Sequence, residues 1–397
     1  MANCGGGALA GAVSQAGGLG FIAAGYNALK TLPGEIAIAK DMIKASPPKQ
    51  IAQRDSSRNV QLPDRLPVGV GFITFLLAKL DRKAHSNGTQ ATSNGSEEDS
   101  PYPALQLVLD AKVAAIWFSF GDCKRYIDYV RWKSPNTKVF VQAVNVQEAI
   151  TAATDWSADV VVLQGSESGG HGAREGHGIT TTSFVPSAIK QLSANSATSK
   201  TLICAAGGVA TGAQLASVLA LGAHGAAIGT RFLLCPEALY SQQAKEALLR
   251  ADDPLATIRT RVFDFARGND DWPLMYDGRA LRNKTTREES EINVANNHLS
   301  AKVWPAPEAQ SSLGEVDDSL DTQVENTHQD SEGGGRALAR LKRLYQDAIH
   351  KNDTDRLVVW ASQSVALMTS VKPAGEILEE INREAVQRIK DLQGLLA

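Results

Sequence analysis

The stretch QGSESGGHGAREGHG, residues 164–178, decides how the rest of the chain is interpreted. It follows Asp159–Leu163, a short apolar run rich in β-branched residues that is typical of a buried parallel strand. Six of its fifteen residues are Gly, so the backbone after the strand can approach a ligand closely. His171 lies on this segment, where an imidazole can exchange a proton near neutral pH. A solvated surface loop would have the same composition, so the interpretation needs support from elsewhere in the chain.

That support comes from two further strands that also end in glycine. The predicted strand Leu202–Ala206 is followed by Gly207 and Gly208, and a helix over 212–221 comes next. The predicted strand Gly225–Ile228 then leads into Gly229 and Thr230. In (β/α)8 barrels, the loops after the last two strands commonly bind phosphate through exposed backbone N–H groups. The spacing therefore indicates a phosphate cradle, and two tight turns that merely require Gly are the alternative.

The same segments carry a resemblance to a known family. QGSESGGH (164–171), AAGGVATG (205–212) and GAAIGTRFLLCPEA (225–238) resemble, in order and spacing, the signature segments of the nitronate monooxygenases, formerly called 2-nitropropane dioxygenases. The N-terminal AGAVSQAGGLGFIAAGY (10–26) is similar to that family's opening segment. The resemblance covers most of residues 1–240 and returns at 355–380. It implies an FMN-binding (β/α)8 barrel of the TIM type, in the α/β class, with a smaller helical domain.

The resemblance also implies a reaction and a set of site residues. Members of the family oxidise an alkyl nitronate, or a nitroalkane, with O2 to a carbonyl compound and nitrite, and they need no NAD(P)H. By the family's pattern, His171 is the base or the group that orients the nitro function. Gln164 resembles the residue that hydrogen-bonds the flavin ring. The residues assigned to FMN are Gln164, Gly169, Gly170, Gly207, Gly208, Gly229 and Thr230.

Other polar residues near these motifs are given different roles. We interpret Glu167 as an acceptor that organises the loop, because an acidic group near an anionic substrate would be unfavourable. His177 lies beyond the matching element and is expected in a loop. His224 precedes the last strand, at the wrong end of a barrel for catalysis, and is expected to be structural or solvated.

Three departures from the family's pattern affect what is expected. Ser168 stands where Ala is common, which bears on substrate fit. Gly71 stands where the family often has an Asn that touches the flavin. In the family an apolar strand ending in Pro-Met precedes the position of Met1, so the first strand is expected to be absent. A missing strand leaves two unpaired edges in the sheet, unless another segment covers the gap.

Alternation of short apolar runs with helical segments predicts a parallel sheet. A Rossmann fold is disfavoured, because no early GxGxxG follows a strand with an acidic residue about 20 positions later. The seven expected strands are Leu19–Ala24, Pro67–Ile73, Ala114–Phe118, Lys138–Ala143 (whose Gln142 faces the barrel or the site), Asp159–Leu163, Leu202–Ala206 and Gly225–Ile228.

Changes in composition divide the chain into three parts. Residues 1–236 are expected to form the barrel, with a polar, disordered insertion near 83–100. Residues 237–354 are expected to form a helical lobe, with a disordered acidic segment near 283–335. Within this lobe, residues 237–250 and 254–265 are predicted to be helical. Residues 355–397 are expected to return to the barrel and supply its last helix, with Trp360 as a packing residue.

Composition excludes several classes of protein. The net charge is −3 and 21% of the residues are charged, so there is no basic footprint for nucleic acid. The four cysteines (Cys4, Cys123, Cys204 and Cys235) have no CxxC spacing, which argues against a metal site and a disulfide framework. No apolar run reaches the roughly 18 residues of a membrane span, and no leader opens the chain. A cytoplasmic setting is expected.

Two alternatives remain open at the level of sequence. The same barrel and flavin site resemble the FMN-dependent enoyl-carrier-protein reductases, which take hydride from NAD(P)H. A chain that lacks its first strand could also be a truncated, non-catalytic homologue. Neither the physiological nitronate nor the oligomeric state follows from the sequence.

Overall fold

Seven parallel strands form one sheet in the order β1-β2-β3-β4-β5-β7-β8. The structure is a computed structural model that describes residues 3–48, 64–86, 100–194, 198, 200–269, 271–288 and 331–394. Each predicted strand is present, with its ends within one residue of the predicted ones. The strands are β1 (Gly20–Ala23), β2 (Leu66–Ile73), β3 (Val113–Ser119), β4 (Lys138–Ala143), β5 (Val160–Gln164), β7 (Leu202–Ala206) and β8 (Gly225–Ala227).

Helices connect successive strands, as the right-handed crossover of parallel strands requires. Asn145 begins one of them by accepting a hydrogen bond from Glu148 N, and Thr211 with Gln214 forms a capping box at another. The helices of this part are α1 (Gly7–Gln15), α2 (Ala28–Ala45), α4 (Thr74–Ser86), α5 (Pro103–Asp110), α6 (Lys124–Lys133), α7 (Val146–Thr154), α8 (Thr181–Ser193), α9 (Gly212–Ala220), α10 (Thr230–Leu233) and α11 (Gln242–Leu249).

The two faces of the sheet have different partners, which distinguishes a barrel from a doubly wound sheet. Ile22, Ile116 and Val161 face outward and belong to the main apolar cluster, together with helix residues such as Leu105 and Phe184. The alternate strand positions form a separate cluster made of strand residues, namely Trp117, Phe140, Val160, Val162, Cys204, Ala206 and Ala227. Because strand side chains alternate between faces, this second cluster is a barrel interior filled by side chains. The predicted (β/α)8-type fold is confirmed.

Aromatic rings fill the interior near β1. The Phe21 ring lies 5.2 Å from both the Trp117 and the Phe140 rings, measured between centroids. A Cβ at Gly69 would lie 2.2 Å from the Phe21 ring, so glycine at this position makes room for the aromatic side chain. Three aromatic side chains from β1, β3 and β4 therefore fill the barrel interior beside β1.

The strand order ends at β1 and β8, which are the edge strands of this sheet. Residues just before α1 lie along the β1 edge. The Gly5 carbonyl accepts a hydrogen bond from Ala23 N at 2.8 Å, and the Cys4 carbonyl accepts one from Leu239 N at 3.0 Å. Residues 4 and 5 therefore link the edge strand β1 with the segment that follows β8 and α10.

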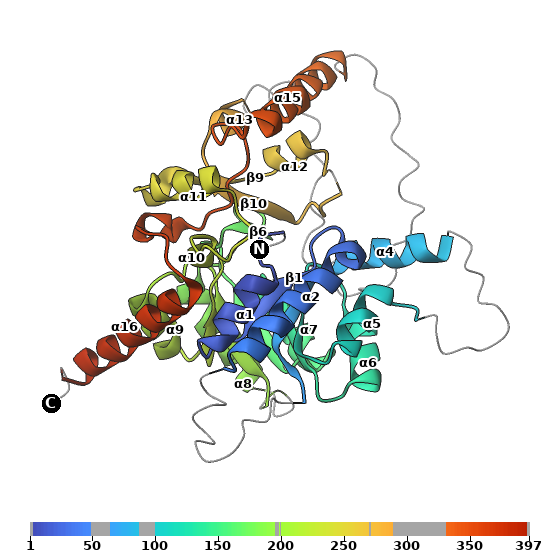
Figure 1. Ribbon diagram of the computed structural model, residues 1–397. Helices are drawn as coiled ribbons and strands as arrows, with labels where there is room; N and C mark the ends of the chain where they lie inside the picture. Colours follow the sequence, from blue (N-terminus) through green and yellow to red (C-terminus); the bar gives the residue numbers. More distant parts are fainter. Residues whose placement is uncertain are drawn as a thin grey trace. The chain divides into compact units, whose positions relative to one another are not determined.

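The C-terminal helix packs against helices of the barrel. Helix α16 (Ala374–Gly394) packs on α9 and α1 (Figure 1). Ile377 and Ile381 are buried with Leu9 and Phe232 in one apolar cluster. The Gly212 backbone N–H, at the start of α9, donates to Glu384 Oε2 at 2.8 Å. The last helix of the barrel is thus supplied by a segment more than 150 residues beyond its neighbour in the sequence.

The chain divides into two compact units. The first contains residues 1–259, 274–281 and 359–397, and the second contains residues 260–273 and 282–358. In its described residues, the second unit contains the helices α12 (Val262–Arg267), α13 (Lys284–Arg287) and α15 (Ser331–Lys351). Residues 237–259, expected in the helical lobe, instead cluster with the barrel, as does 274–281.

A second, three-stranded sheet was not predicted. It has the order β6-β10-β9, with β6 (Gly170–Ala173), β10 (Tyr276–Leu281) and β9 (Thr257–Thr260). The prediction of a helix over 254–265 is wrong, because this region contains a 3₁₀ turn (Pro254–Ala256), β9 and the start of α12. The three strands, GHGA, TIRT and YDGRAL, lack the run of apolar residues that marks the barrel strands.

Most residues of the two expected disordered segments, 87–99 and 289–330, lie outside the described part of the chain. Their ends are helical, which corrects the predicted boundaries. Residues 83–86 belong to α4, residues 284–287 form α13, and residues 331–335 belong to α15. Within the described residues, no helix is long and apolar enough to cross a membrane. No group of three or more His, Cys, Asp or Glu residues in this part of the chain could hold a metal ion.

The packing of α16 on α9 depends on the absence of a side chain at Gly212. A Cβ there would lie 2.4 Å from the Ile381 carbonyl oxygen and 2.5 Å from Ala385 N. Gly212→Ala should therefore lower the free energy of unfolding by about 1–3 kcal/mol, the usual cost of overpacking. The matched control is Gly34→Ala in α2, where a Cβ would meet no atom within 4 Å. Thermal unfolding should show a lower Tm for the first variant and an unchanged or raised Tm for the second.

Candidate functional site

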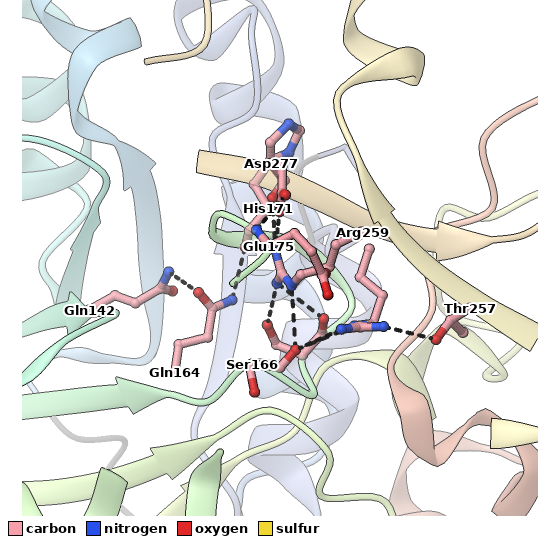
Figure 2. A network of polar contacts seen from close by, with 10 residues as sticks. Gln142, Gln164, Ser166, His171, Glu175, Thr257, Arg259 and Asp277 are labelled. Carbon is pink, nitrogen blue, oxygen red and sulfur yellow. Dashed lines mark hydrogen bonds and ion pairs between the residues drawn. The ribbon is translucent and has the colours of Figure 1, made fainter. Parts of the chain in front are cut away.

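A chain of amide hydrogen bonds runs across the carboxyl ends of β4 and β5 to β6. Gln142 Nε2 donates to Gln164 Oε1 at 3.0 Å, and Gln164 Nε2 donates to the His171 carbonyl at 3.0 Å (Figure 2). An amide has two N–H groups and two lone pairs, so each interaction leaves Gln164 with one more of each. Gln164 thus lies at the end of the central strand, and its side chain retains one N–H and one lone pair beyond these two hydrogen bonds.

Strand β6 presents two different faces. His171 pairs with Gly278 of β10, and its ring lies 5.1 Å from the Trp360 ring, tilted by 54°. The next residue, Gly172, faces the other way, because a Cβ there would lie 3.0 Å from Gln164 Oε1. The structure therefore brings Gln164 to the backbone of His171, while the imidazole lies on the opposite face of the strand. Sequence reasoning had placed both residues in one site without distinguishing these faces.

Tyr276 shares the His171 face of the small sheet. It lies two residues from Gly278, and its ring contacts Phe120, which follows β3, with the centroids 4.9 Å apart. Burial, followed by the nearby charge of Glu148, raises the pKa of Tyr276, so its phenol stays protonated at neutral pH. This face therefore carries an imidazole, an indole and a neutral phenol.

The opposite face holds a buried charge cluster that sequence reasoning missed. Arg259 of β9 and Asp277 of β10 form an ion pair with NH1 2.6 Å from Oδ1, and their side chains are only 2% and 4% exposed. Arg259 NH2 also donates to Ser168 Oγ at 3.2 Å, and Asp277 Oδ2 accepts from Glu175 N at 2.7 Å. The pair therefore holds both ends of the segment that carries His171.

Arg279 of β10 completes the cluster. Its Nε and NH2 donate to the Ser166 carbonyl at 3.3 and 3.2 Å, and its NH1 donates to Thr257 Oγ1 at 3.3 Å. Burial, with the nearby charge of Arg259, lowers the pKa of Arg279. The charges of Glu175, Asp277 and Glu167 act in the opposite direction on Arg279, so its guanidinium lies among carboxylates beneath the loop after β5.

The ends of β7 and β8 expose backbone donors. Gly207 and Gly208 have φ angles of +93° and +75°, a conformation that strongly favours glycine. Within the described residues, the N–H groups of Gly207, Gly208, Gly229 and Thr230 donate no hydrogen bond. All four residues are half-buried. Unpaired, partly buried N–H groups at strand ends are what a phosphate requires, so this edge fits the phosphate of a flavin nucleotide.

The returning segment 361–364 lies against the same edge, which the sequence did not indicate. Ser362 N donates to Thr230 Oγ1 at 3.2 Å, and Ser364 Oγ donates to the Gly208 carbonyl. A Cβ at Gly169 would lie 2.7 Å from Ser362 N, so this glycine permits the close approach of the two backbones. Gly170, by contrast, has a φ of +72° and open space around its Cα.

The remaining residues singled out from the sequence have structural partners. Both carboxylate oxygens of Glu167 accept from Thr181 N, at 3.0 and 2.9 Å, so Glu167 organises the loop at the start of α8, as expected. His224 Nδ1 accepts from Ile203 N at 3.0 Å and supports β7. His177 lies in an exposed turn, where its N–H donates to the Arg174 carbonyl. A Cβ at Gly71 would meet its nearest neighbours at 3.9 Å, so the strand end has room for a larger residue.

Removing one partner of the buried ion pair should destabilise the protein strongly. Arg259→Met would leave the Asp277 carboxylate buried without its charge partner, at a cost of about 3–5 kcal/mol in the free energy of unfolding. The double variant Arg259→Met/Asp277→Leu should recover much of this loss. Urea unfolding measures both, with Lys124→Met as control, since its ion pair with Asp128 is exposed on both sides and is worth less than about 1 kcal/mol. A loss for Arg259→Met no larger than the control's would contradict this account.

Comparison with known proteins agrees with this geometry. A family model described as nitronate monooxygenase matches residues 1–384. The nitronate monooxygenase of Neurospora crassa is 27% identical over 408 residues, which cover 98% of this chain and 89% of the relative. Nitronate monooxygenase npaC of Metarhizium robertsii is 33% identical over 288 residues, covering 70% of each chain.

Solved structures agree on the fold. FabK from Thermotoga maritima superposes with a TM-score of 0.65 at 23% identity, over 100% of this chain and 93% of that one. A nitroalkane oxidase from Streptomyces ansochromogenes gives a TM-score of 0.62 at 23% identity, over 98% and 94%. With a family model that spans almost the whole length, and a barrel whose strand ends carry the motifs, the chain belongs to the nitronate monooxygenase family and is an oxidoreductase.

Proposed function

We propose that this enzyme uses FMN to oxidise alkyl nitronates with O2, yielding a carbonyl compound and nitrite. The observation that carries the proposal is the row of unpaired N–H groups at Gly207, Gly208, Gly229 and Thr230, next to the loop that bears Gln164 and His171. The names of the relatives support the substrate class. When bound, FMN supplies the electron transfer, and the protein supplies binding, orientation and electrostatics.

The residues divide the work of holding the cofactor. The phosphate would accept hydrogen bonds from the four N–H groups of the β7 and β8 ends. Gln164 would hydrogen-bond the flavin ring with the donor and acceptor that its contacts to Gln142 and His171 leave over. Gly169 lets the returning segment reach this loop, and Gly170, whose Cβ position is open, leaves backbone that a planar ring can approach.

His171 would handle the proton or the nitro group of the substrate. With a neutral nitroalkane, a ring nitrogen of His171 can take the α-proton, which leaves the nitronate. With a preformed nitronate, the imidazolium form can pair with the anionic nitro group.

The phosphate assignment predicts a difference between two flavins. Charge-assisted hydrogen bonds are worth about 1.5–3 kcal/mol each, so the apoprotein should bind FMN at least about tenfold more tightly than riboflavin. Quenching of flavin fluorescence measures both affinities, and inorganic phosphate should compete with FMN but not with riboflavin. Equal affinities for the two flavins would mean that these N–H groups do not bind the phosphate of FMN. Gly208→Val is a poorer test, because the positive φ at this position strains any side chain.

The role of His171 predicts a split between substrate forms. General acid–base assistance is typically worth ~10²–10⁴-fold in rate, so His171→Ala should lose about that much turnover with neutral nitroalkanes. Preformed nitronates should lose less, and FMN content should stay normal. His177→Ala is the matched control, since His177 lies in an exposed turn.

Steady-state kinetics on both substrate forms provide the measurement. Unchanged turnover of both forms in His171→Ala, or an equal loss in the control, would refute the assignment. Running the assays with and without NADH distinguishes the alternative function, because an enoyl reductase would require the nicotinamide. Flavin reduction by NADH, with no reduction by a nitronate under anaerobic conditions, would favour that alternative.

A further inference from the structure

Trp360 lies at the point where the returning segment meets the strand that carries His171. Its backbone forms a β-bridge with Ala280 of β10, and the hydrogen bonds on either side of the bridge fix its position. Leu281 N donates to the Val359 carbonyl at 2.9 Å, and Ala361 N donates to the Arg279 carbonyl at 3.4 Å. The returning chain is thus tied to β10 immediately before and after Trp360.

The indole occupies the cross-strand position beside His171. Gly278 is the residue that pairs with His171, and a Cβ at Gly278 would lie 2.3 Å from the indole Cζ3 and 2.7 Å from Cη2. The six-membered ring of Trp360 therefore rests directly on the Gly278 backbone. From there it contacts the imidazole, with the ring centroids 5.1 Å apart. A side chain at position 278 would occupy the space of the indole, so the position of the Trp360 ring depends on glycine at 278.

We propose that Trp360 is a positioning residue that holds the His171 imidazole in its working orientation, an inference that rests on the proposed function. The terminal torsion of a histidine is broad, so packing has to select the ring orientation. A large flat side chain whose backbone is fixed by β10 can make that selection. Misplacement of a catalytic group by about 1 Å can cost ~10²-fold in rate, so the loss of this contact should be visible in turnover.

Four variants of the full-length holoenzyme test the proposal. Trp360→Ala removes the indole, and Trp360→Phe keeps a flat ring. Gly278→Ala displaces the indole without removing it, and the double variant Gly278→Ala/Trp360→Ala removes the clash together with the ring. Trp132→Ala is the matched control, because Trp132 lies on α6 with its side chain 71% exposed. FMN content and Tm are recorded for every variant.

The kinetic expectation is a loss in kcat with a smaller change in KM. Trp360→Ala and Gly278→Ala should each lower kcat about 10- to 100-fold with nitroalkanes. Trp360→Phe should restore most of the rate, and the double variant should be no slower than Trp360→Ala, because the two changes act through one contact. Trp132→Ala should match the wild type. These outcomes together support a positioning role, since a general loss of stability would not be rescued by phenylalanine.

A chemical measurement tests the contact independently of turnover. Diethyl pyrocarbonate modifies accessible imidazoles, and peptide mass spectrometry reports the rate at each histidine. Trp360→Ala should raise the rate at half-buried His171 several-fold and leave the exposed His177 and His224 unchanged. The proposal is overturned if kcat stays within about twofold of wild type in both Trp360→Ala and Gly278→Ala, or if Trp360→Phe is as slow as Trp360→Ala. If the wild-type enzyme does not oxidise nitronates at all, the proposed function fails, whereas the modification rates still decide whether Trp360 covers His171.

Discussion

The ion pair between Arg259 and Asp277 is the interaction on which the site depends. Taking two charges out of water is costly, and an ion pair repays that cost only when further hydrogen bonds satisfy both partners. Here the guanidinium reaches Ser168, and the second carboxylate oxygen accepts from Glu175 N. Through these hydrogen bonds, the buried ion pair holds both the loop after β5 and the segment just after β6. His171 lies between these two anchors, so its backbone cannot move far without breaking the pair.

The small sheet extends this constraint to the C-terminal part of the chain. Because β10 pairs with β6 on one side and bridges to Trp360 on the other, the strand that positions His171 also positions the returning segment. That segment then continues to Ser362 and Ser364, whose hydrogen bonds reach the ends of β8 and β7. The region around His171 and the phosphate edge are therefore coupled through continuous backbone contacts.

Glycines serve two physically different purposes in this arrangement. Gly207 and Gly208 have positive φ angles, a backbone conformation that strongly favours glycine. Gly169 and Gly278 are needed for a different reason, since a Cβ would collide with Ser362 N or with the Trp360 indole. The first pair is required by backbone conformation, and the second pair allows distant segments to approach. Glycine is thus required by backbone conformation at some positions and by the lack of space for a side chain at others.

The sequence by itself determined the barrel strands, the glycine-bearing strand ends and the placement of Gln164 and His171 after the central strand. These features are local, since each follows from a short apolar run and the residues that end it. Glu167 as a loop acceptor also followed, from charge alone. The structure decided the rest. Arg259 donates to Ser168, 91 positions earlier in the chain, and Arg279 donates to Ser166, 113 positions earlier. No local sequence pattern marks such a pairing. Whether His171 faces Gln164 or Trp360 depends on strand register, because a shift of one residue reverses every side chain, and register is fixed only when β6 pairs with β10.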